Sequence, residues 1–188
     1  GQLVFGNEFL TNPWASGFYG VKLSNDESFL FVSGYEFFAG YETLAPYLYK
    51  MSTSGDIVNS RMIGADYYAM EEFVVNSSNQ LFANVSTNDT LRFASFDSEL
   101  ELRWKTEILL PGYGAYGGKY PSFFFSNGDV LYVTFAENTN DNNDQLLLLT
   151  RINVDGDVVW HTSKSLFEAN GYRFLGIDFY VDPLDNVH

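Results

Sequence analysis

The chain has 188 residues, with 10 Lys and Arg against 24 Asp and Glu, which gives a formal net charge of −14. So acidic a chain repels phosphate backbones and anionic lipids, and neither nucleic acid binding nor membrane insertion is expected. Cysteine is absent, which excludes disulfides, thiolate catalysis and Cys-ligated metals, while 46% apolar and 18% aromatic residues can supply a core.

Four stretches of the chain consist of a polar turn followed by apolar residues. This pattern predicts a tight turn that leads into a β-strand. The stretches begin 51, 50 and 56 residues apart, a spacing typical of repeat architectures such as propeller blades. They cover residues 25–31, 76–82, 126–132 and 182–188.

Two further elements recur between these stretches. Residues 47–58, 90–104 and 147–160 each predict strand, hairpin turn and strand, and the pair Asp155-Gly156 is typical of a two-residue turn with positive φ. Short apolar runs precede each polar turn and predict strands buried on both faces. These runs are residues 18–21, 72–75, 122–125 and 177–180.

Each period therefore contains four short antiparallel strands, and we predict an all-β fold, a β-propeller of four-stranded blades in one domain over residues 1–188. The predicted parts are a terminal strand over 1–12, blades over 18–63, 72–109 and 122–163, and the start of another blade over 177–188. A β-sandwich also has short strands, but it does not predict that the same strand–turn–strand sequence pattern recurs along the chain. The incomplete blades at both ends favour a segment of a larger propeller, with a four-bladed ring completed by another chain as the alternative.

The strand–turn–strand sequence from Leu147 to Trp160 resembles the repeat of quinoprotein-like (PQQ-type) β-propellers. The turn–strand segments are similar to repeats of secreted bacterial propellers. In this resemblance Trp104 and Trp160 occupy the Trp position of the repeat, with Ser60 or Arg61 near it in the first blade. Quinoprotein enzymes hold a quinone over a Trp, often beside adjacent cysteines, and bind calcium. This chain has no cysteine, so no quinone cofactor is expected.

The long connections all fall at one end of the predicted strands, which is where we expect a binding face for a protein or a glycan. Tyr113, Tyr116 and Tyr120 in the Gly-rich run 111–121 are the candidate ligand contacts, with packing between blades as the alternative. Asp141, Asn143 and Asp144 offer oxygen ligands suited to calcium, with a solvated polar turn as the alternative.

Three Asn-x-Ser/Thr sequons are present, at Asn76, Asn84 and Asn88, and either glycosylation of an exported protein or coincidence explains them. His161 and His188 stand in no catalytic or metal-binding spacing, so no catalytic residue is predicted. The sequence thus predicts a secreted or cell-surface propeller module for protein or glycan binding, or for structural assembly, including strand completion between copies of the chain. The alternative is a segment of a quinoprotein-like enzyme whose active site lies outside these residues.

Overall fold

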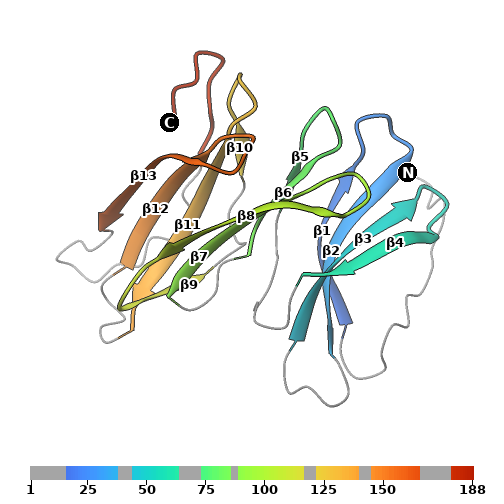
Figure 1. Ribbon diagram of the computed structural model, residues 1–188, viewed down its shortest axis with the longest axis horizontal. Helices are drawn as coiled ribbons and strands as arrows, with labels where there is room; N and C mark the ends of the chain where they lie inside the picture. Colours follow the sequence, from blue (N-terminus) through green and yellow to red (C-terminus); the bar gives the residue numbers. More distant parts are fainter. Residues whose placement is uncertain are drawn as a thin grey trace.

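The computed structural model describes residues 16–37, 44–63, 73–85, 89–116, 122–139, 145–165 and 179–188. Within these ranges the regular structure is β-strand throughout, without a helix, which confirms the predicted all-β class. The strands form antiparallel sheets that lie one after another along the chain (Figure 1).

Each sheet contains a four-stranded antiparallel meander, as predicted, in which each strand pairs with the next one in sequence. The first sheet contains β1 (Ser16–Leu23), β2 (Phe29–Phe37), β3 (Leu44–Ser52) and β4 (Ile57–Met62). The second contains β5 (Phe73–Val75), β6 (Leu81–Asn84), β7 (Thr90–Phe96) and β8 (Leu102–Leu109). The third contains β10 (Phe123–Phe124), β11 (Val130–Asn138), β12 (Gln145–Ile152) and β13 (Val158–Ser165). In the third sheet an additional strand, β9 (Tyr113–Tyr116), also pairs with β11. The terminal strand predicted over residues 1–12 lies outside the described residues.

Six hairpin turns of the described chain share one construction, while the turn between β1 and β2 is one residue longer. In the turn Asn153–Asp157, the N–H of Asn153 donates to the Asp157 carbonyl and the N–H of Gly156 donates to the Asn153 carbonyl. The side-chain Oδ1 of Asn153 accepts from the amides of Asp155 and Asp157, which is why a short polar residue opens the turn. A positive φ is needed only at Gly156 (+95°), so the predicted two-residue turn is wrong and a longer bulged turn takes its place.

The same backbone pattern closes five other hairpins, with the fourth residue of each turn at positive φ. These residues are Gly55, Asn79, Leu100, Gly128 and Asp185. Leu100 is unusual among them, because a Leu at a φ of +65° carries backbone strain that Gly would avoid. The strain is offset by burial, since the Leu100 side chain is only 1% exposed.

Apolar clusters join each sheet to the next. Phe31 and Leu48 of the first sheet share a cluster with Leu81 and Phe96 of the second. On the opposite face of the second sheet, buried residues pack against the third; these are Phe82, Leu91 and Phe93 against Val130, Tyr132, Ala136, Leu148 and Ile152. The second sheet is therefore covered on both faces.

The expectation that the short runs before the polar turns are buried on both faces is wrong for β1, where Tyr19 is 45% exposed and Val21 59% exposed. β1 is the edge strand of its sheet and pairs only with β2 among the described strands. The strands buried on both faces are instead interior ones, such as β6, where every residue is buried. An edge strand has a neighbour on one side alone, so fewer atoms cover its side chains.

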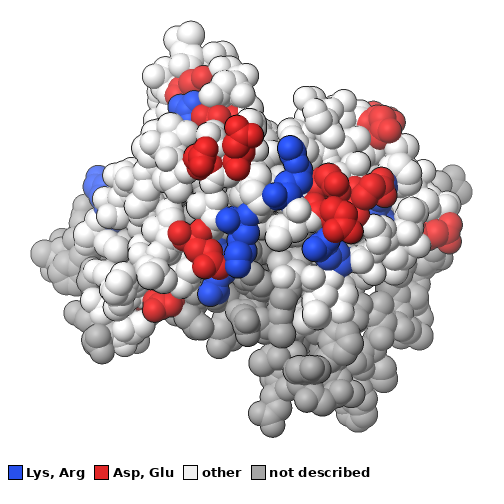
Figure 2. All heavy atoms as spheres, viewed as in Figure 1, with Lys and Arg blue, Asp and Glu red and all other residues white. Residues whose placement is uncertain are grey.

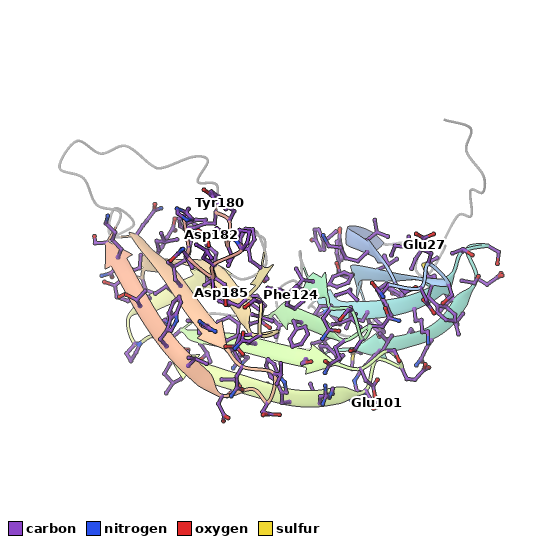
Figure 3. The ribbon with its side chains drawn as sticks, turned by 90° about the horizontal axis from the view of Figure 1, so that it is seen from above. Glu27, Glu101, Phe124, Tyr180, Asp182 and Asp185 are labelled. Carbon is purple, nitrogen blue, oxygen red and sulfur yellow. The ribbon has the colours of Figure 1, made fainter. Side chains whose placement is uncertain are left out.

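Seen from above, the sheets lie along an arc (Figure 3). The labelled Tyr180 and Asp182 lie on the concave side of this arc, and Glu101 lies on the convex side. Residues 179–188 form a further hairpin in which Val181 pairs with Val187. This hairpin packs on the third sheet through Phe179, Val181 and Val187.

Candidate functional site

The candidate site is a set of contacts in which the last strand of one sheet holds the turn between the third and fourth strands of the next; we call them strand-to-turn contacts. Between the second and third sheets, Trp104 Nε1 donates to the carbonyl of Val154 at 3.0 Å. Two residues further along β8, Thr106 Oγ1 donates to the carbonyl of Gly156. Both acceptors are backbone atoms of the turn Asn153–Asp157, so β8 binds the turn by its main chain.

Trp104 also determines which residue the turn can carry at its fourth position. A Cβ added to Gly156 would lie 2.8 Å from two atoms of the Trp104 ring, closer than van der Waals contact allows. Gly156 therefore meets two requirements, the positive φ of the turn and the close approach of the indole.

The first and second sheets repeat the strand-to-turn contacts with different side chains. Asn59 Nδ2 donates to the carbonyl of Glu99 at 2.7 Å, and Arg61 Nη1 donates to the carbonyl of Leu100 at 3.1 Å. Asn59 and Trp104 each lie four residues after the positive-φ residue of their own hairpin, so Asn59 is the counterpart of Trp104 in the first sheet and lies next to Ser60. The smaller Asn59 stands opposite a turn that carries Leu100, whereas Trp104 stands opposite glycine.

Ion pairs reinforce this first interface. Lys50 Nζ lies 2.6 Å from Glu99 Oε1 and 4.2 Å from the centroid of the Phe29 ring, while Arg61 pairs with Glu101. Figure 2 shows basic side chains next to acidic ones on the face that it displays. Because the acidic partners Glu99 and Glu101 are largely exposed, solvent screens the Coulomb attraction of these pairs, which therefore contributes little to stability.

A second recurring contact links the turns between the first two strands of successive units. The N–H of Asn25 donates to Asn79 Oδ1 at 2.7 Å, across the first and second sheets. In the same way, the N–H of Ser126 donates to Asp185 Oδ1 at 2.7 Å, and Ser126 Oγ donates to Asp185 Oδ2 at 2.6 Å. Asn79 and Asp185 are both the positive-φ residues of their turns, so one residue shapes its own turn and binds the preceding unit.

The contact between Ser126 and Asp185 is expected to depend on pH. Hydrogen bonds from Ser126 hold the pKa of Asp185 below its ordinary value of 3.8. Because the folded-state pKa is lower than that of the unfolded chain, the carboxylate stabilises the contact above the unfolded value, and this contribution is lost as pH falls through the folded-state pKa. We expect the Ser126 amide resonance to titrate with a midpoint below 3.8.

An NMR pH titration would measure this midpoint, with Asp185→Asn as the control because it keeps an oxygen acceptor but has no proton to gain. The titration of the Ser126 amide should disappear in that variant. A midpoint at or above the ordinary carboxyl value in the unsubstituted chain would contradict the prediction.

The three candidate ligand tyrosines are placed differently from one another. Tyr113 is partly buried and packs against the cluster between the second and third sheets. Tyr116 lies on β9 (Tyr113–Tyr116), which the sequence reading missed and which pairs with β11 opposite Phe135 to Asn138. Tyr120 lies outside the described residues. The sequence did not predict β9 because residues 111–121 are rich in glycine, which is depleted in strands.

The candidate calcium ligands Asp141, Asn143 and Asp144 lie outside the described residues. In the ranges that the structure describes, no group of three or more His, Cys, Asp or Glu is arranged to hold a metal ion.

The sequons also differ in their surroundings. Asn84 is 2% exposed and its Nδ2, the atom that carries an N-linked glycan, donates to Thr134 Oγ1 at 2.7 Å. Asn76 opens a turn, where its Nδ2 donates to Gln80 Oε1 at 2.8 Å. Asn88 lies outside the described residues. A glycan on Asn84 would be incompatible with the packing of β6 against β11.

We therefore expect Asn84 to be unmodified in folded protein made by a glycosylating host. Enzymatic release of an N-glycan converts the attached Asn to Asp, so peptide mass mapping after release reports occupancy at each sequon. Asn76 and Asn88 serve as internal references in the same digest. Conversion of Asn84 in the folded fraction would contradict the prediction.

No protein-family model and no curated protein sequence matches this chain. Among the described residues, the search for a helix long and apolar enough to span a membrane found none.

Proposed function

We propose that the three sheets are consecutive blades of a β-propeller, and that the chain is a binding or assembly module of a secreted or cell-surface protein. The observation that carries the proposal is the recurrence of the strand-to-turn contacts between successive sheets, with Asn59 and Trp104 in equivalent places. Because the same contact recurs between successive sheets, each sheet is joined to the next in the same way, as blades are joined in a propeller.

The coverage of the second sheet supports a propeller over a sandwich. A sandwich packs two sheets through one shared core. Here the second sheet contributes Leu81 and Phe96 to a cluster with the first sheet, and Phe82 and Phe93 to a cluster with the third. Figure 3 likewise shows the sheets following one another along an arc, as consecutive blades would.

The proposed ligand is a protein or a glycan bound at the strand ends opposite the hairpin turns. The connections between β2 and β3, and between β11 and β12, leave from that end, as does β9 with its two tyrosines. Loops and aromatic side chains on a rigid scaffold are a common basis for recognition. The acidic charge of −14 favours ligands that are neutral or basic.

Binding of the purified chain to arrays of oligosaccharides and of cell-surface proteins, with and without added calcium, tests this function. We expect saturable binding that the double substitution Tyr116→Ala/Tyr120→Ala weakens by about tenfold or more. Tyr180→Ala is the matched control, because Tyr180 is a 57% exposed tyrosine far along the chain from this run.

A quinone titration in parallel distinguishes the alternative enzyme function. Tight stoichiometric uptake of a quinone, together with failure to bind any arrayed ligand, would overturn the binding-module proposal and favour the quinoprotein-like one.

A further inference from the structure

Asn127 precedes a glycine in the turn that connects β10 to β11. In this turn, residues 125–129, the N–H of Phe125 donates to the Asp129 carbonyl at 2.9 Å and the N–H of Gly128 donates to the Phe125 carbonyl at 3.0 Å. Asn127 is exposed at the third position. Every other asparagine of the described residues is followed by a residue other than glycine, and the pair Asn170-Gly171 lies outside them.

The side-chain amide of Asn127 is held at its oxygen and free at its nitrogen. Oδ1 accepts from the Asp129 amide at 3.1 Å and from Arg151 Nη2 at 3.3 Å. Nδ2 has no hydrogen-bond partner in the part of the chain that the structure describes. The two donors polarise the amide carbonyl and make Cγ more electrophilic, while Nδ2 can depart into solvent.

The backbone nitrogen of Gly128 is the atom that can close a five-membered ring with Asn127 Cγ. Glycine has no side chain to obstruct this approach, and its backbone has more conformational freedom than that of any other residue. The Gly128 N–H is bonded to the Phe125 carbonyl, so the ring forms when the turn opens. A single exposed turn opens at a much lower free-energy cost than the strands of a core.

We propose that Asn127 is a site of spontaneous deamidation, with water as the co-reactant. Gly128 N attacks Asn127 Cγ, so that an N–Cγ bond forms, the Cγ–Nδ2 bond breaks, and ammonia leaves with the proton of the Gly128 N–H. Water then opens the cyclic imide at either of its two carbonyls. Opening at Cγ gives aspartate, and opening at the main-chain carbonyl gives isoaspartate. Water is consumed and ammonia is released, and nothing is oxidised or reduced.

The turn accommodates the aspartate product. The turn of residues 153–157 has the same backbone pattern, and it carries Asp155 and Gly156 at the positions of Asn127 and Gly128. A carboxylate at position 127 accepts the same two hydrogen bonds, and the guanidinium of Arg151 then acts as a charged donor to a charged acceptor. Conversion to aspartate should therefore preserve the fold.

Isoaspartate changes the turn, because its main chain runs through the former side chain and is one carbon longer. The two main-chain hydrogen bonds of residues 125–129 then lose their geometry. Ser126 belongs to the same turn and binds Asp185 through both its amide and its hydroxyl. Deamidation is thus a slow covalent change that loosens the contact between the third sheet and the hairpin of residues 179–188 in the molecules that form isoaspartate.

Incubation of the chain of 188 residues in water labelled with a heavy oxygen isotope, at a series of pH values, tests the site. Peptide mass mapping then identifies the asparagines converted during the incubation, because only these take up the label. The rate at Asn127 should rise with pH, since the attacking nitrogen must lose its proton.

Asn153 is the matched internal reference, because it lies in a turn of the same pattern but precedes Val154, and its Nδ2 donates to Asp157 Oδ2 at 3.2 Å. We expect Asn127 to convert at least about tenfold faster than Asn153, because a β-branched side chain crowds the attacking nitrogen of the reference.

Hydrogen exchange of the Ser126 amide tests the structural consequence. The isoaspartate form is separated chromatographically from the incubated chain, and Asn127→Asp supplies the aspartate product directly. We expect the Ser126 amide to stay protected in Asn127→Asp and to exchange about tenfold faster or more in the isoaspartate form, because the bond to Asp185 is lost.

Conversion of Asn127 no faster than that of Asn153, or formation of aspartate without isoaspartate, would overturn the site and its route through the cyclic imide. Unchanged protection of Ser126 in the isoaspartate form would overturn the consequence for the hairpin. The proposed ligand site lies at the opposite strand ends, so these outcomes leave the proposed function standing.

Discussion

Replacing Phe82 with alanine is expected to lower the free energy of unfolding by about 3–5 kcal/mol, the range for deleting a buried aromatic ring. Phe82 is 0% exposed and packs between the second and third sheets. Its ring centroid lies 6.0 Å from that of Trp104 and 5.6 Å from that of Phe124, so the substitution removes contacts within one sheet and across to the next. Chemical denaturation followed by tryptophan fluorescence measures the change.

Leu109→Ala is the control for this substitution, because Leu109 is an apolar residue on β8 of the same sheet but is 69% exposed. Its effect should stay within about 0.5 kcal/mol. Similar losses in the two variants would contradict the core between the second and third sheets.

Gly156→Ala is expected to have the second large effect, a loss of roughly 2–5 kcal/mol, because backbone strain and a steric clash add together. The strain comes from the φ of +95°, which is costly for alanine. The clash comes from the Trp104 ring, 2.8 Å from the position of the new Cβ.

Gly112→Ala separates these two causes. Gly112 has a φ of +84°, but a Cβ there would have nothing within 4 Å, so it reports the strain alone, about 1–2 kcal/mol. A second check combines Gly156→Ala with Trp104→Ala, and the pair should cost less than the sum of the single changes because the clash is gone. Equal costs for the two glycine substitutions would exclude a clash with the indole.

The sequence predicts the sheets well because the residues that end one strand and begin the next lie close together in the chain. Polar residues such as Asn153 open the turns through side-chain hydrogen bonds, and Gly156 supplies the positive φ, so each hairpin can be recognised from five residues. The repetition of these signals at about 50 residues then groups the strands into sheets.

Features that depend on contacts between sheets could not be predicted in this way. Leu100 occupies a conformation that leucine disfavours, and only its burial against the first sheet explains the choice. Asn84 carries a glycosylation signal in its sequence, yet its amide is buried against Thr134 of the third sheet. The tryptophans could be identified as repeat positions, but the carbonyl that binds Trp104 lies in another sheet.

The spacing of the contacts between sheets has a consequence for how such a chain can change its length in evolution. Asn84–Thr134, Trp104–Val154 and Thr106–Gly156 each join residues 50 positions apart. Duplication of the unit that contains Trp104, Thr106 and the turn that they bind would preserve the last two pairings, because their acceptors are backbone carbonyls. An insertion inside the turn Asn153–Asp157 would displace both carbonyl acceptors at once, so we expect length variation among related chains to fall in the longer connections between strands and in whole units.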